Sequence, residues 1–217
     1  MKTLLSQRTK TILIPGPCGN IEALVSESKN SNEYAVICHP HPLHGGSMHN
    51  KVVTTIAKAL DKHNINTIRF NYRGVGDSNG SYDNGVGEIN DLMAVYSWGK
   101  KYFEEKSCLL AGFSFGSYIC AAATKEIKPI ALITLAPAIS SQDYKNIPNH
   151  LCPWLFVQGE KDEVVDANKG IAWAKQHPNK PQIKLMADTS HFFHGKLQQL
   201  EEIIIAFIEG EITQNDN

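Results

Sequence analysis

Gly112-Phe113-Ser114-Phe115-Gly116 is the strongest indication of the fold of this chain, because of the segments that flank it. Residues 107–111 before it are largely apolar and suit a buried strand, and residues 117–123 after it suit the opening of a helix. A strand, G-x-S-x-G and a helix together form a nucleophile elbow, in which the chain reverses within a few residues. The two glycines remove Cβ atoms that would collide in so tight a turn. We therefore predict that Ser114 has a strained backbone, with its hydroxyl held clear of the sheet.

The composition limits the class of protein. The 217 residues fit one domain, residues 1–217, with enough hydrophobic side chains (42%) for a sizeable core. The formal net charge of −1 gives no basic footprint for nucleic acid or anionic membranes. Residues 1–10 lack the apolar run of a signal peptide, and the apolar run 130–139 is too short to span a bilayer. Five scattered cysteines without a C-x-x-C pair indicate small core residues in a reducing compartment, so we expect a cytoplasmic protein.

Short β-rich runs alternate with amphipathic helical runs along the chain. Strands are expected at 11–14, 21–25, 34–38, 66–71, 107–111, 130–135, 154–158 and 182–186, and further helices at 50–63, 88–103, 167–175 and 196–208. The first two strands flank a Pro- and Gly-rich turn and form a hairpin. Near-continuous apolar strands separated by helices indicate a mostly parallel sheet covered on both faces, a three-layer α/β/α sandwich. The expected buried face of helix 88–103 carries Ile89, Leu92, Met93 and Tyr96, with Trp98 or Phe103.

A serine hydroxyl is a poor nucleophile unless a base takes its proton and a third group orients that base. In this type of fold an acid and then a histidine follow the serine along the chain. The candidate acids, just past the strand that ends at Gly159, are Glu160, Asp162, Glu163 and Asp166. The candidate bases are His150, His177, His191 and His194. His177 ends a helix and would lie at the wrong edge of the sheet, whereas His191 and His194 share a loop at the carboxyl end of a strand.

Three stretches resemble the motif stretches of the α/β-hydrolase superfamily, namely residues 112–116, 159–165 and 190–193. The chain is also similar to a small bacterial branch related to dienelactone hydrolases and S33-type serine peptidases, at residues 39–53, 73–78 and 85–88 and at Asp91. The resemblance covers nearly the whole chain and implies the α/β-hydrolase fold. It also implies a catalytic triad in which Ser114 is the nucleophile, Asp162 the acid and His191 the base.

An oxyanion hole needs two N–H donors that point at the developing negative charge. One is expected at Phe115, the residue after the nucleophile. The other comes from the loop after strand 34–38, whose two prolines have no N–H and leave His39, His41 and Leu43 as nearby donors. The superfamily usually places this donor two residues past a histidine equivalent to His39, which implies His41.

The histidines of the same loop allow a second interpretation. His39, His41, His44 and His49 raise the alternative of a zinc-assisted hydrolase. No carboxylate follows in that segment, and the prolines restrict the rings, so we expect neither a metal nor another cofactor. We expect His39 and His44 to contact the substrate instead.

Charged residues near the Gly-rich loop 73–78 also have two interpretations. Arg73 is expected to contact the substrate, and both Arg73 and Asp77 have the alternative role of fixing this loop. Glu88 and Asp91 lie at a helix start, where they favour the helix dipole and need no catalytic explanation.

The connection 136–153 between two strands is too short for a cap domain. We therefore expect an open site that binds a small-molecule acyl substrate. A carboxylic ester is the first expectation, a thioester the second and a peptide the third, because no pocket for an N-terminal amine is identifiable. The alternative to an enzyme is a non-catalytic binding module that keeps the fold. Such a module would not require all three members of the triad.

Overall fold

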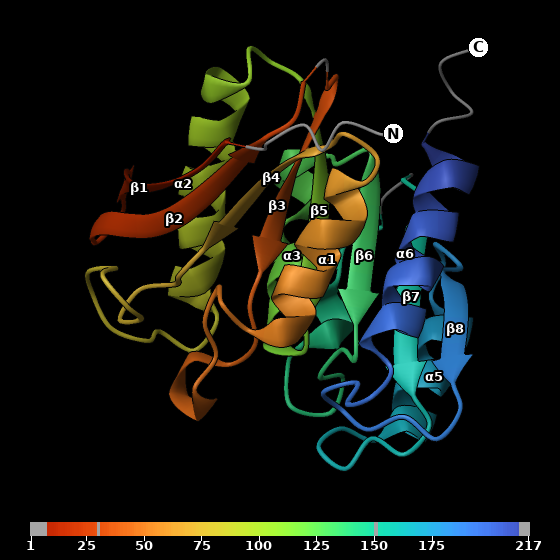
Figure 1. The fold of residues 1–217 in the computed structure, drawn as a ribbon. Helices are drawn as coiled ribbons and strands as arrows, with labels where there is room; N and C mark the ends of the chain where they lie inside the picture. Colours follow the sequence, from red (N-terminus) through yellow and green to blue (C-terminus); the bar gives the residue numbers. More distant parts are fainter. Residues whose placement is uncertain (1–7, 30, 150–151, 213–217) are drawn as a thin grey trace.

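The computed structural model describes residues 8–29, 31–149 and 152–212. Within this part, one eight-stranded sheet has the order β1-β2-β4-β3-β5-β6-β7-β8 (Figure 1). The strands are β1 (Arg8–Gly16), β2 (Gly19–Glu27), β3 (Glu33–Cys38), β4 (Asn66–Phe70), β5 (Ser107–Phe113), β6 (Ala131–Leu135), β7 (Trp154–Gly159) and β8 (Gln182–Met186). β1 and β2 form the predicted hairpin, and β2 pairs antiparallel with β4. All other pairings are parallel, as the apolar strands predicted.

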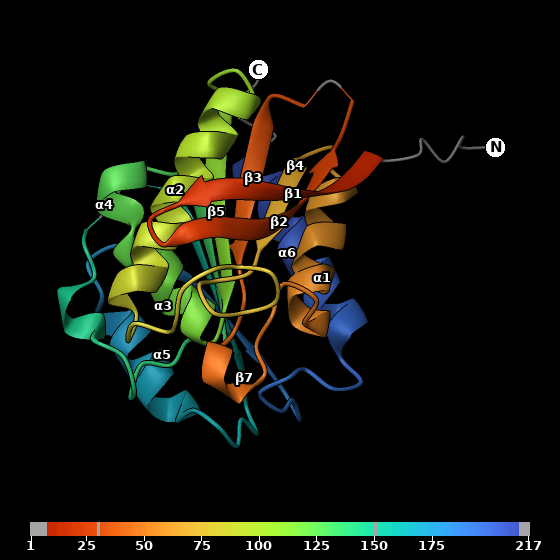
Figure 2. The ribbon, with the colours of Figure 1, turned by 90° about the vertical axis from the view of Figure 1, so that its left-hand side faces the viewer.

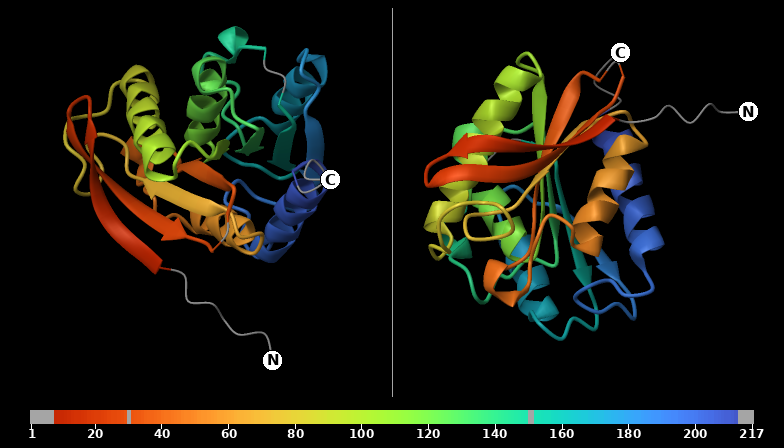
Figure 3. Two further views of the ribbon diagram at one scale, coloured as in Figure 1. Left: turned by 90° about the horizontal axis from the view of Figure 1, so that it is seen from above. Right: turned by 60° about the vertical axis from the view of Figure 1, so that its left-hand side comes forward.

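Helices cover both faces of the sheet, as the view from above shows (Figure 3). α1 (Lys51–Asp61) and α6 (Leu197–Glu211) pack on one face, and α2 (Val86–Tyr102), α3 (Phe115–Ala122) and α5 (Ala167–Gln176) cover the other. The short elements are α4 (Thr124–Ile127) and the 3-10 turns η1 (Pro42–His44) and η2 (Tyr144–Asn146). The predicted three-layer sandwich is confirmed.

Strand burial explains why the sheet has two cores. Along β5, Leu110 faces the α2 and α3 side, whereas Leu109 and Ala111 face the α1 and α6 side. Alternate residues of one strand therefore enter different cores, which requires both faces to be apolar. The β1–β2 hairpin crosses steeply over the parallel strands (Figure 2), as expected from the twist of a large sheet.

The buried face of α2 differs from the expected one. Leu92 and Phe103 are buried as predicted, but Val95, Gly99 and the carboxyl-bearing Glu88 and Asp91 are also buried. The residues predicted for this face at positions 89, 93, 96 and 98 are only partly buried. The helix turns its polar first turns inward because loop N–H groups and an arginine bind them there.

Loops at the carboxyl ends of the parallel strands gather on one side of the molecule, at the bottom of Figure 1. The loops after β3, β5, β7 and β8 all lie on this side. Between β6 and β7, the described residues contain only the turn η2 and no cap domain. No helix in the described part of the chain is long and apolar enough to cross a bilayer.

Candidate active site

Ser114 lies at the sharp turn between β5 and α3. Its φ of 54° and ψ of −114° fall in a region that residues with a side chain rarely adopt. A Cβ at Gly116 would lie 2.6 Å from the His39 carbonyl oxygen, and a Cβ at Gly112 would overlap the Gly116 carbonyl. The turn is further held by Ser117, whose Oγ lies 2.9 and 3.0 Å from the carbonyl oxygens of Gly112 and Leu135 and shares its one proton between them. The strained serine that the motif predicted is therefore present.

The side chains of Ser114, His191 and Asp162 form one hydrogen-bonded chain. The Ser114 hydroxyl lies 3.1 Å from His191 Nε2, and His191 Nδ1 lies 2.8 Å from Asp162 Oδ2. A carboxylate only accepts, so Nδ1 carries the proton and Nε2 is free to accept from the serine. His194, the other histidine of this loop, is exposed, and its ring contacts only Phe192 among the described aromatic pairs. His177 caps the far end of α5, and His150 lies outside the described residues.

Asp162 is a buried carboxylate with several donors. Burial alone would raise its pKa, but the hydrogen bonds from His191 and from the N–H groups of Val165 and Val164 outweigh burial and hold the pKa below its usual value. Glu163, another candidate acid, accepts the backbone N–H of His191 at 3.1 Å. The chain of three side chains therefore has an ionised end, held in place by backbone donors.

Two backbone N–H groups near Ser114 are free to donate. Among the described residues, neither the Phe115 N–H nor the His41 N–H has an acceptor in the protein. The Pro40 carbonyl accepts from His39 Nδ1 at 2.6 Å, and the peptide between Pro40 and His41 is trans. Because C=O and N–H point in opposite directions across a trans peptide, the His41 N–H points away from His39 and the core. Gly46 closes the loop by donating its N–H to the His41 carbonyl at 3.1 Å.

His39 does not contact the substrate directly, contrary to our expectation, because its side chain has no exposed surface. Its Nδ1–H donates to Pro40, and its Nε2 accepts the Tyr72 N–H at 3.1 Å. Burial lowers the pKa of this imidazole to about 3, so the ring is neutral. With both nitrogens occupied, His39 cannot be a metal ligand either. It supports the loop that carries His41.

Arg73 does not line the cavity beside Ser114, contrary to our expectation of a substrate contact, and has the alternative role of fixing the Gly-rich loop. Its side chain is 8% exposed and donates to the Asp91 carboxylate, with an Nη2–Oδ1 distance of 2.8 Å. The guanidinium lies against Gly87, where any Cβ would collide with it. Asp91 also accepts the Arg73 backbone N–H at 2.9 Å. The pair therefore fixes the Gly-rich loop to α2.

A cavity of about 400 Å³ opens beside Ser114. It is lined by Pro40, His41, His44, Gly45, Gly46, Asn50, Ser114, Val164, His191 and Phe192. None of these ten residues carries a carboxylate, ammonium or guanidinium group. Burial and the neighbouring His44 lower the pKa of His41, which favours its neutral form. The cavity is therefore suited to a neutral ligand.

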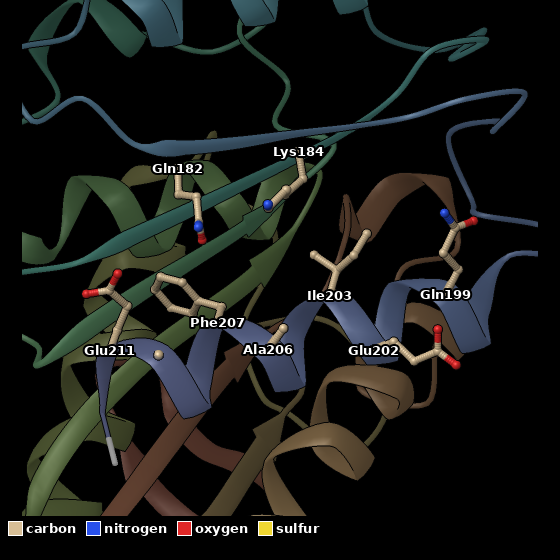
Figure 4. Close-up of a pocket in the computed structure, with 9 residues that line it drawn as sticks. Gln182, Lys184, Gln199, Glu202, Ile203, Ala206, Phe207 and Glu211 are labelled. Atoms are coloured by element: carbon tan, nitrogen blue, oxygen red, sulfur yellow. The ribbon is translucent and has the colours of Figure 1, made fainter. Parts of the chain in front are cut away.

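A second cavity, of about 390 Å³, lies between β8 and α6 (Figure 4). Gln182 and Lys184 of β8 lie opposite Ile203 and Phe207 of α6. Ser114, His191 and Asp162 do not line this second cavity. In the described part of the chain, no group of three or more His, Cys, Asp or Glu side chains could hold a metal ion.

The sequence reasoning missed several residues of the site. Val164, Phe192 and Asn50 line the cavity, and Tyr82 lies with its hydroxyl 3.2 Å from His41 Nε2. Gln158, a polar residue in the apolar strand β7, donates to Asp162 at 2.9 Å. Its polarity was the available signal, because a buried polar side chain needs a partner.

Comparisons with known proteins agree with this fold. The family model described as serine aminopeptidase, S33, matches residues 41–152. A lidless α/β serine hydrolase from Xanthomonas campestris is 36% identical, with 96% of this chain and 97% of that chain covered and a TM-score of 0.89. An α/β serine hydrolase homologue from Coxiella burnetii is 44% identical, with 91% and 96% covered and a TM-score of 0.87. A protein of Rickettsia prowazekii is 31% identical, with 89% of this chain and 86% of that protein covered.

Proposed function

The chain belongs to the family described as serine aminopeptidase, S33, and is an α/β serine hydrolase; from this we propose that it cleaves carboxylic esters through an acyl-enzyme intermediate. The observation that carries the proposal is the chain of hydrogen bonds from Ser114 through His191 to Asp162. The serine at the start of this chain has a strained backbone and lies beside two free N–H groups. Nucleophilic catalysis by a serine requires this arrangement.

The proposed reaction has two halves. Ser114 Oγ attacks the ester carbonyl carbon while His191 Nε2 takes the hydroxyl proton, and Asp162 stabilises the imidazolium. The N–H groups of Phe115 and His41 donate to the oxyanion. The intermediate collapses when His191 returns the proton to the leaving alcohol, which leaves the acyl group on Ser114. A water molecule then gives a proton to His191 and attacks the acyl carbon. The bond between this carbon and Ser114 Oγ breaks as His191 returns the proton to Oγ, and a carboxylic acid leaves.

The cavity beside Ser114 supports an ester over a peptide with a free N-terminus. A bound α-ammonium group requires a carboxylate or several acceptors, because an unpaired charge is costly to desolvate. The lining of the cavity offers no carboxylate, and its apolar residues Val164 and Phe192 are 59% and 38% exposed. These surfaces, with His44 and Asn50, are the proposed contacts of a neutral acyl substrate. A thioester remains the second candidate within the same mechanism.

Replacement of the nucleophile tests the mechanism. In Ser114→Ala we expect kcat for a p-nitrophenyl ester to fall by about 10⁴ with the fold unchanged, as for other serine triads. A fluorophosphonate probe should label the wild type and leave this variant unlabelled. Labelling of the variant would place the nucleophile elsewhere.

The substrate class needs a separate comparison. Parallel assays on p-nitrophenyl esters, thioesters and aminoacyl p-nitroanilides should give the highest kcat/KM for the oxygen esters. A preference for the aminoacyl anilides would identify an aminopeptidase instead. Absence of both turnover and labelling in the wild type would favour a binding module that keeps the fold.

A further inference from the structure

Gln158 lies behind Asp162 near the end of β7 and has no exposed surface. Its Nε2 donates to Asp162 Oδ2 at 2.9 Å, and the same oxygen accepts from His191 Nδ1 at 2.8 Å. The other oxygen, Oδ1, accepts the N–H groups of Val164 and Val165 at 2.9 and 2.8 Å. Asp162 thus receives two donors on each oxygen, and Gln158 and His191 are its side-chain donors.

This arrangement leaves the other end of the Gln158 amide without a partner. Its Oε1 is buried and accepts no hydrogen bond from the described residues. A Cβ at Gly170 would lie 3.6 Å from Oε1, so this oxygen faces α5. A buried carbonyl oxygen without a donor is unfavourable, and the other residues of β7 up to this point, residues 154–157, are all buried and apolar. A side chain selected for stability alone would therefore be apolar here.

The orientation of the amide follows from its contact with Asp162. A rotation by 180° would exchange the two ends of the amide and bring Oε1 against the carboxylate of Asp162, where two acceptors would repel each other. The N–H contact is thus retained at the expense of an unpaired oxygen. An unpaired amide oxygen is tolerated here because the carboxylate of Asp162 must keep one position.

We propose that Gln158 is a positioning residue, whose amide holds Asp162 Oδ2 in line with His191 Nδ1 and shares its negative charge. The inference rests on the proposed triad. Without this donor, Oδ2 keeps His191 as its one side-chain donor, is held less firmly, and directs more charge at the imidazole. The imidazolium then persists to higher pH, which moves the acid side of the pH–rate profile upward. Among the described residues, the other titratable side chain in hydrogen-bond contact with this pair is Glu163, which accepts the His191 backbone N–H and is unchanged in the variants below.

Two substitutions of nearly equal size separate positioning from a structural role. In Gln158→Met we expect kcat/KM for p-nitrophenyl acetate to fall about tenfold and the acid side of its pH profile to move upward. The thermal midpoint should stay equal or rise, because the unpaired oxygen is gone. In Gln158→Glu, a second carboxylate beside Asp162 should move the profile further upward. The control is Gln176→Met on the exposed end of α5, which should match the wild type.

A spectroscopic signal gives a second measurement that needs no turnover. The proton between His191 Nδ1 and Asp162 Oδ2 should give a downfield ¹H NMR resonance, which shifts in Gln158→Met and is unchanged in Gln176→Met. Wild-type kinetics and an unshifted resonance in Gln158→Met would overturn the inference. Lower activity with a lower thermal midpoint, an unchanged pH profile and an unshifted resonance would show a structural role and overturn it too. If the wild type cleaves no ester, the proposed function fails while the resonance still tests Gln158.

Discussion

Mild acid should destabilise this protein through His39, whose ring the fold keeps neutral. The ring donates to Pro40 and accepts from the Tyr72 N–H, and it has no exposed surface. Protonation would place a second donor against the Tyr72 N–H and a charge in the core. In the folded protein, burial therefore lowers the pKa of His39 to about 3, whereas the pKa of a histidine in the unfolded chain is near 6.5.

The magnitude follows from linkage between protonation and folding. Because the folded pKa is depressed, the unfolded chain binds more protons below pH 6.5, and stability falls as pH decreases from 6.5 toward 3. Between pH 6.5 and 5 the difference spans about 1.5 pH units, and each unit corresponds to roughly 1.4 kcal/mol. His39 should therefore lower the free energy of unfolding by about 2 kcal/mol at pH 5 relative to neutral pH.

Urea unfolding at pH 7 and pH 5 measures this effect in the wild type and in His39→Gln. Glutamine keeps a donor and an acceptor but does not titrate, so the variant should lose about 2 kcal/mol less over this interval. Burial lowers the pKa of His41 and His177 as well, but both are present in the two proteins and cancel in the comparison. Equal losses in the two proteins would refute a neutral, buried His39.

Three further outcomes are expected. His191→Ala should lower kcat by about 10⁴, whereas His194→Ala should retain most activity; the reverse result would assign the base to the wrong histidine. In urea unfolding, Gly116→Ala should destabilise the protein by about 1–3 kcal/mol or more, because the new methyl group meets two carbonyl oxygens. Gly210→Ala, on the open surface of α6, should stabilise it by about 0.5–1 kcal/mol. A p-nitrophenyl ester series from acetate to palmitate should show weak chain-length selectivity, because an added methylene contributes at most ~1–3 kcal/mol even in a closed pocket. A jump in rate at the micellar threshold would reveal a lid.

Local sequence patterns were sufficient for the layers and for the elbow. Strand and helix periods depend on neighbouring residues, so the parallel sheet and its helices followed from the alternation of apolar runs. The backbone of Ser114 likewise depends on two flanking glycines within the same turn. Such features are encoded within a few residues, so the sequence could predict them before the fold was known.

The selection among similar side chains required the tertiary structure. Chain order left four acids and two histidines of one loop, and only the resemblance chose among them. In the fold, His194 is exposed, whereas His191 is buried with its Nε2 3.1 Å from Ser114 Oγ. Contacts between distant segments also placed Arg73 on Asp91 and buried His39 in the core. Whether a polar side chain faces substrate or a buried partner depends on which strands become neighbours. That neighbourhood is set by the packing of the whole chain, and no local pattern contains it.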